Sequence, residues 1–136
     1  MHLPTITACY LAVLALLYVV LSLQVIRLRR MNGAAFGDSD NVALRSAIRA
    51  HAHFAEYVPI TTLMVAFLEA SGASALRVHV LMGALVAARL LHPLGMYAAP
   101  STFGFRIGRI GGVTITIGLL VTCALSILSR LALGGQ

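Results

Sequence analysis

One stretch of the chain concentrates side chains that can bind and activate a small molecule. It reads Arg-Ser-Ala-Ile-Arg-Ala-His-Ala-His-Phe-Ala-Glu-Tyr-Val-Pro from Arg45 to Pro59. Each residue of an α-helix advances by about 100°, so Arg49, His53 and Glu56 stand at about 40°, 80° and 20° from Arg45. These four side chains therefore share one stripe of a helix surface, whereas His51 falls on another face. We refer to Arg45, Arg49, His53 and Glu56 as the polar stripe.

The depth of the polar stripe restricts what it can face. Glu56 lies about 20 Å along its helix, and a charged group facing lipid at that depth costs at least a few kcal/mol. The stripe must then face the helix bundle, a subunit interface or a water-filled cavity. Arg49 and Glu56 are about two turns apart, so each needs a partner on another helix or on a ligand. A polar network that only orients helices is one interpretation; its size in so small and apolar a chain favours a binding site.

The elements that position the stripe are expected to be membrane-spanning helices. The chain of 136 residues is 60% hydrophobic and 10% charged, whereas a soluble domain carries about 25% charged residues. Its apolar runs are long enough to cross about 30 Å of hydrocarbon. We expect a single domain over residues 1–136, an all-α membrane protein built as a four-transmembrane-helix bundle. The expected segments are Leu3–Ile26, Val42–Ala70, Ala75–Tyr97 and Ile110–Ser129.

Polar and glycine-bearing stretches predict the connections. Loops are expected at Met31–Asn41, Ser71–Ser74 and Ala98–Phe105. Either Asp40 or Asn41 can cap the second helix, which Pro59 should kink.

The distribution of arginines predicts the topology. The net charge is +6, and all basic residues are arginine. The first and third loops share one side, which holds Arg27, Arg29, Arg30, Arg106 and Arg109; the other side holds Arg77 and Arg130. The positive-inside rule places the first side in the cytoplasm and both termini on the non-cytoplasmic side. Membrane topology thus explains the basic balance, and no nucleic-acid partner is expected. The exclusive use of arginine suggests a GC-rich bacterium and hence its inner membrane.

Two further pairs of polar residues recur at helical spacing. Arg89 and His92 share a helix face, as do Arg106 and Arg109. Each pair is part of a site or, alternatively, its arginines snorkel to the membrane surface and His92 is a hydrogen-bonded histidine. The two cysteines match no metal or redox spacing, so no metal site is expected.

Residues Arg49 to Pro59 resemble the second-helix signature of the MAPEG family, the membrane-associated proteins of eicosanoid and glutathione metabolism. That signature reads Arg-Ala-His/Gln-x-Asn-x-x-Glu, often followed by Tyr-x-Pro. The sequence Arg27-Leu28-Arg29-Arg30, the pair Arg89-x-x-His92 and the chain length add to the resemblance, which covers essentially the whole chain.

The resemblance implies a homotrimer with glutathione bound as co-substrate between neighbouring subunits, near the cytoplasmic side. Arg49, Glu56 and Tyr57 match family residues that contact glutathione, and Arg29 or Arg30 matches the arginine pair at the end of the first helix. Arg106 lies where the thiol-activating arginine is expected, with Arg109 as its alternative. The candidate glutathione-binding residues are Arg29, Arg30, Arg45, Arg49, His53, Glu56, Tyr57, Arg89, His92 and Tyr97, and the candidate catalytic residues are Arg106 and Arg109.

One position departs from the family signature. His53 stands where the family has asparagine. Neutral histidine also donates and accepts hydrogen bonds, but with another geometry and with a ring that titrates. His53 could therefore tune the site for another ligand.

These observations predict a membrane-bound glutathione-dependent transferase or peroxidase that acts on a lipophilic electrophile, with an arginine stabilising the thiolate. The electrophile itself is not identified. The alternative is a non-catalytic lipid-binding member of the family. A small proton-coupled exporter is disfavoured because such proteins usually carry an essential carboxylate in the first helix, and here that helix has no charge.

Overall fold

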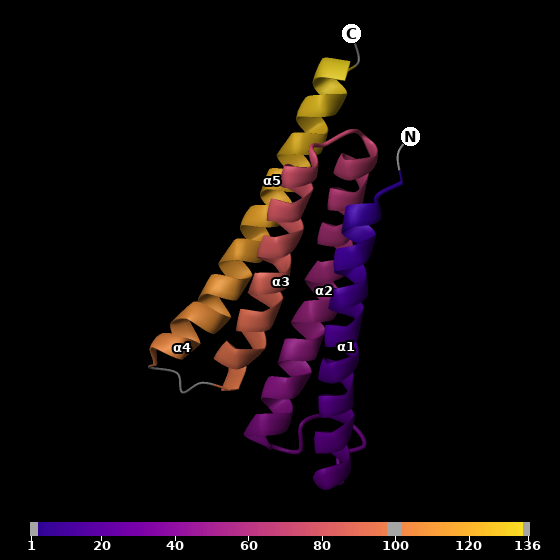
Figure 1. Ribbon diagram of the computed structural model, residues 1–136. Helices are drawn as coiled ribbons and strands as arrows, with labels where there is room; N and C mark the ends of the chain where they lie inside the picture. Colours follow the sequence, from indigo (N-terminus) through magenta and orange to yellow (C-terminus); the bar gives the residue numbers. More distant parts are fainter. Residues whose placement is uncertain (1–2, 98–101, 135–136) are drawn as a thin grey trace.

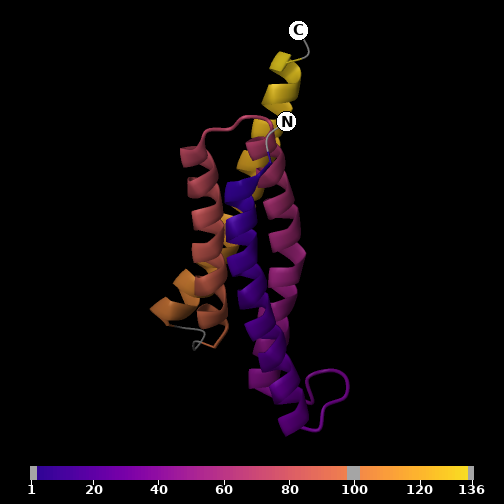
Figure 2. The same cartoon turned by 45° about the vertical axis from the view of Figure 1, so that its right-hand side comes forward.

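The computed structural model describes residues 3–97 and 102–134, and the helices in this part of the chain form an elongated bundle (Figure 1). Figure 2 shows the same helices from a second direction. No strand occurs among the described residues, so the all-α prediction is confirmed. The elements are α1 (Thr5–Met31), α2 (Val42–Ala70), α3 (Ala75–Tyr97), the short α4 (Phe103–Phe105), the π-helical η1 (Arg106–Gly111) and α5 (Gly112–Gly134).

Within the described residues, three stretches are long and apolar enough to cross a membrane. They are Thr5–Met31, Ala75–Met96 and Phe103–Leu133, with mean hydropathies of 2.4, 1.4 and 2.1. Large apolar side chains such as Leu16 and Leu125 are exposed on the outside of the bundle, as expected where lipid replaces water. Although α2 has 29 residues, it carries the polar stripe and is not among the three. A fourth span through α2 remains a prediction.

All four long helices contribute to one apolar core. Leu14 of α1, Val65 of α2, Leu85 of α3 and Cys123 of α5 are each fully buried in it. Close packing of such side chains holds the helices in fixed register. The polar residues at either end of the bundle are positioned by this core.

Contacts at one end of the bundle tie three chain segments together. The Glu69 carboxylate accepts hydrogen bonds from the backbone of Ile6 at 2.9 Å and from the backbone and hydroxyl of Thr7 at 2.8 and 2.6 Å. Arg130 donates to the carbonyl of Ser71 at 2.5 Å. The start of α1, the α2–α3 turn and the end of α5 therefore meet at this end, here called the turn end (Figure 1). The α1–α2 loop lies at the opposite end, here called the loop end.

The predicted connections are confirmed in part. Asn41 caps α2 by accepting from Leu44 N at 2.9 Å, and the Ser71–Ser74 turn is present with Gly72 at φ +84°. α2 continues unbroken past Pro59.

The loop predicted at Ala98–Phe105 is wrong where the structure describes it. Residues 98–101 lie outside the described part, but Phe103–Phe105 is helical because the Thr102 side chain accepts a hydrogen bond from Phe105 N and caps the turn. Helical structure then continues through η1 and α5 to Gly134, so the last helix exceeds the predicted Ile110–Ser129 at both ends.

Two glycines allow the π-helical segment to approach α3 closely. A Cβ atom added to Gly95 would stand 2.2 Å from the backbone nitrogen of Arg109, and one added to Gly108 would stand 2.5 Å from Gly95 Cα. Only glycine fits at both positions. Single-turn π segments are often found at functional sites, and this one sets the position of Arg109.

Candidate functional site

A basic pocket of about 320 Å³ opens at the loop end, between the last turn of α1 and the first turns of α2. Arg29 donates to the carbonyl of Ala35 at 3.1 Å and so stays beside the loop. Arg45 forms an ion pair with Asp38, and this guanidinium holds the pKa of the Asp38 carboxyl below its usual value. The lining residues are Arg29, Gly37, Asp38, Arg45, Ile48 and Arg49.

The polar stripe continues from this pocket along α2. Arg49 Nη2 donates to His53 Nε2 at 3.0 Å. Arg49 and Glu56 are exposed, and among the described residues no hydrogen bond or ion pair reaches the Glu56 carboxylate. His51 lies on another face, as predicted, where it stacks on Tyr18 with ring centroids 4.7 Å apart. The stripe thus leaves Arg45, Arg49 and the Glu56 carboxylate exposed on the surface of the single chain.

Arg89 has a different environment. Its side chain is buried at 1% exposure, where it donates to the carbonyl of His53 at 3.2 Å and to that of Gly112 at 3.3 Å. It also donates to the hydroxyl of Thr116, and it lies 5.9 Å from the ring centroid of Tyr57. Arg89 therefore joins α2, α3 and α5 from inside the bundle, with its guanidinium facing backbone and hydroxyl oxygens.

His92 lies next to Arg89 and stacks on His53. The ring centroids are 5.0 Å apart and the ring planes differ by 11°. His92 is 1% exposed. The backbone of Arg109 is close to it, yet neither ring nitrogen has a hydrogen-bond partner among the described residues. His53 Nδ1 also lacks a partner there.

The two candidate catalytic arginines, Arg106 and Arg109, both lie in η1. The backbone of Arg109 packs against α3, where its nitrogen would stand 2.2 Å from a Cβ atom added to Gly95. The Arg109 guanidinium also lies 5.2 Å from the ring centroid of Phe105. η1 therefore packs Arg109 against α3, and the assignment of the catalytic arginine stays a prediction.

Several of the predicted site residues meet at His53. It contacts Arg49, Tyr57, Arg89 and His92, and Glu56 follows it by about one turn of α2. Arg29 and Arg45 line the adjoining basic pocket, and Arg30 is exposed at the end of α1. Tyr97 ends α3, and its side chain lies outside the described part.

Several residues that hold the site had not been singled out. Asp38 fixes Arg45, Gly112 and Thr116 fix Arg89, and Gly95 admits η1. Two features of the sequence could have indicated them. Arg89 stands in an apolar helix and needs acceptors, and Gly112 is followed four residues later by Thr116, so both share one helix face.

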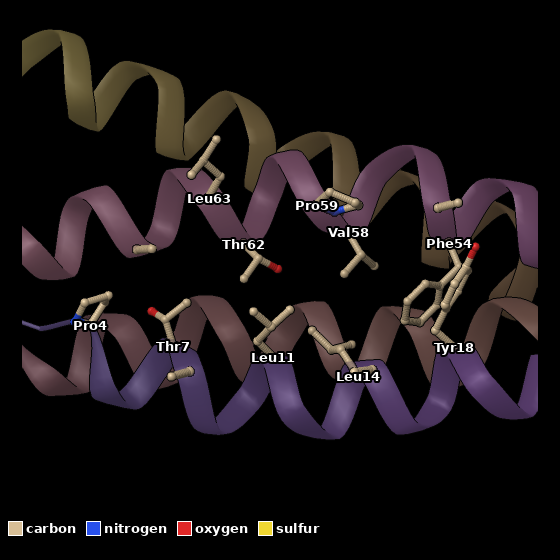
Figure 3. Close-up of a pocket in the computed structure, with 14 residues that line it drawn as sticks. Pro4, Thr7, Leu11, Leu14, Tyr18, Phe54, Val58, Pro59, Thr62 and Leu63 are labelled. Carbon is tan, nitrogen blue, oxygen red and sulfur yellow. The ribbon is translucent and has the colours of Figure 1, made fainter.

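A second cavity is apolar and lies between the same two helices, closer to the turn end. It is a groove of about 670 Å³ between α1 and α2 (Figure 3). Leu11, Leu14 and Tyr18 point into it from α1, and Val58 and Thr62 from α2. It contains no charged side chain and can take a lipophilic molecule.

Comparison with known proteins agrees with this architecture. The MAPEG family profile matches residues 7–129. Inner membrane protein YecN of Escherichia coli, strain K12, is 38% identical over 92 residues, which cover 68% of this chain and 70% of that protein. YecN of strain O6:H1 matches equally. No solved structure shows a significant match. With the family profile covering nearly its whole length, the chain belongs to the MAPEG family.

Proposed function

We propose that this protein is a membrane-bound enzyme that uses glutathione to conjugate or reduce a lipophilic electrophile. The observation that carries the proposal is the exposed, unpartnered Glu56 carboxylate, which lies about two turns along α2 from Arg49 of the basic pocket. MAPEG membership supports a role related to glutathione.

Glutathione has two carboxylates, an amine and a thiol, and the loop end offers a complementary charge pattern. Arg29 and Arg49 line the pocket and bind the carboxylates in this proposal, since guanidinium groups bind carboxylates in a bidentate manner. Glu56 binds the amine. Arg45 is already paired with Asp38, so it shapes the pocket more than it binds the ligand.

Arg109 is the proposed activator of the thiol. A free thiol has a pKa near ~8.5, so only a few per cent is thiolate at neutral pH. A guanidinium close to sulfur lowers this pKa by about two units, equivalent to about 2.7 kcal/mol. Because η1 packs the Arg109 backbone against Gly95 of α3, the helix that carries His92, Arg109 is favoured over Arg106.

The proposal includes an assembly and a membrane orientation. A lipid-facing Glu56 would be costly, so α2 spans the membrane with the polar stripe turned toward a neighbouring subunit of a homotrimer. The loop end faces the cytoplasm and the turn end the other side, following the arginine asymmetry. YecN is an inner membrane protein, and we place this chain in a bacterial inner membrane likewise.

A non-catalytic lipid-binding role is the second candidate, and the apolar groove between α1 and α2 is the observation that favours it. In the enzymatic proposal, lipophilic substrates reach the thiolate from the same lipid phase. Both roles therefore predict binding of a lipophilic probe, and only the enzymatic role predicts thiolate formation.

The test is glutathione binding by the protein purified in mild detergent, measured by titration calorimetry and by the ultraviolet absorbance of thiolate. We expect Arg49→Ala and Glu56→Gln to weaken binding at least tenfold while preserving the fold. Arg77→Ala is the matched control, because Arg77 is exposed in the first turn of α3, at the turn end and away from the pocket at the loop end. Unchanged affinity in both site variants would refute the pocket assignment. Absence of thiolate and conjugation in the parent protein would leave the lipid-binding role.

A further inference from the structure

The stacked pair of His53 and His92 is the feature that glutathione binding alone does not explain. Arginine and glutamate suffice to hold the ligand, yet His53 of the polar stripe stacks on a second imidazole ring, that of the buried His92. Three of their four ring nitrogens have no hydrogen-bond partner among the described residues. Buried polar groups without partners are uncommon in proteins, and they often mark sites that act on a ligand.

The tautomer of His53 follows from its one hydrogen bond. Arginine has donors and no acceptor, so Arg49 Nη2 donates and His53 Nε2 accepts. A neutral His53 ring therefore carries its proton on Nδ1, and its lone pair points along the stripe toward Arg49. Any group that draws Arg49 away leaves that lone pair free to accept a proton. A ligand carboxylate is such a group.

We propose that His53 is the proton acceptor for the thiol of glutathione and that carboxylate binding by Arg49 exposes it. This inference rests on the proposed function. The thiol S–H bond breaks, its electron pair stays on sulfur, and a new N–H bond forms at His53 Nε2. After sulfur has attacked the electrophile, the same proton passes to the leaving group or to the oxyanion of the product. The histidine is thereby regenerated, and no further reactant is consumed.

The charges around the ring determine whether this transfer can occur. The ordinary pKa of a thiol exceeds that of imidazole by about two units, so Arg109 must stabilise the thiolate for transfer to proceed. Arg49 donates to the His53 ring at 3.0 Å and Arg89 donates to the His53 carbonyl at 3.2 Å, and these two positive charges oppose a third on the ring. The carboxylates of bound glutathione add negative charge beside these arginines and so reduce the repulsion between the arginines and a protonated His53 ring. The other titratable groups that face the ring are Tyr57 and His92.

His92 acts as a positioning residue in this arrangement. Its buried ring lies parallel to that of His53 and fixes the plane in which His53 Nε2 points. Because His92 is 1% exposed, it does not contact the ligand directly. His92→Phe should keep the stacking and preserve proton transfer.

The experiment counts protons released to the medium for each thiolate formed. Parent protein in weak buffer with a pH indicator is mixed with glutathione, while ultraviolet absorbance reports thiolate. S-methyl glutathione, which has no thiol proton, gives the background from carboxylate and amine binding. We expect the parent protein to release well under one proton per thiolate, and His53→Asn to release close to one. His51→Asn, two residues away on another helix face, should match the parent.

Each outcome decides the inference. One proton released per thiolate in the parent would overturn it while leaving the proposed function standing, and this result needs no variant. Equal proton counts in the parent and His53→Asn would overturn it likewise, with His53→Gln as the replacement if the asparagine variant fails to fold. If the parent neither binds glutathione nor forms thiolate, the proposed function fails and the inference falls with it.

Discussion

Replacement of Glu69 tests how the turn end of the bundle is held together. The carboxylate accepts three hydrogen bonds from the first turn of α1, and Thr7, which donates two of them, is buried at 2% exposure. Glu69 thus supplies acceptors for backbone N–H groups that have no acceptor within helix α1. Its negative charge is also attracted to the partial positive charge at the start of that helix.

The expected cost follows from the groups left without partners. In Glu69→Ala the three donors lose their acceptor; the Ile6 amide is only partly buried and can find water, and the Thr7 hydroxyl can rotate. We expect the free energy of unfolding to fall by about 2–4 kcal/mol. In Glu69→Gln one oxygen remains, while the new amide group faces another donor, so about 1–2 kcal/mol should be lost.

The assay is equilibrium unfolding in mixed detergent micelles, with helicity as the readout. Glu56→Gln is the matched control, because this exposed glutamate on the same helix has no hydrogen-bond partner among the described residues. Combining Glu69→Gln with Thr7→Val should give a loss smaller than the sum of the two single losses. A Glu69→Ala protein within about 0.5 kcal/mol of the parent would refute the reasoning.

Three other predictions concern the site and its support. Gly95→Ala should lower the free energy of unfolding by about 1–3 kcal/mol, because its Cβ would stand 2.2 Å from the Arg109 backbone nitrogen. Gly118→Ala, whose Cβ would have nothing within 4 Å, should leave the free energy of unfolding unchanged in the same assay. Arg109→Ala should shift the pH profile of conjugation to higher pH by as much as about two units, because loss of the positive charge raises the thiol pKa. Arg106→Ala should shift the profile less. A larger shift in Arg106→Ala would contradict the assignment of Arg109 as the thiol-activating residue. The lowered pKa of Asp38 means that its ion pair stabilises the fold above about pH 4 and loses this effect as the pH falls through the folded-state pKa. Asp38→Asn should therefore be less stable than the parent at neutral pH, and the two proteins should become equally stable in acid.

Local sequence patterns were sufficient for the class of the protein and for which residues of α2 share a helix face. Long apolar runs predicted membrane helices, and three of them are present as apolar helices of spanning length. Helical spacing correctly grouped Arg49 with His53 and separated His51 from them. The Asn41 cap was also foreseeable, because capping depends on a few neighbouring residues.

The start of the last helix was not foreseeable in the same way. Glycine and proline around positions 100–104 predicted a loop, yet helical structure begins at Phe103. The Thr102 cap starts it, and packing of Gly108 against Gly95 holds the π-helical segment against α3. Tertiary packing of this kind overrides the local preference of glycine for turns.

Only the tertiary structure decided which side chains meet. Arg89 reaches Thr116 across 27 positions of sequence, and Glu69 reaches Thr7 across 62. The stacking of His53 on His92 depends on how α2 and α3 pack. Spacing along the chain reports which residues share a helix face; which faces meet depends on the shape and burial of side chains that are distant in sequence.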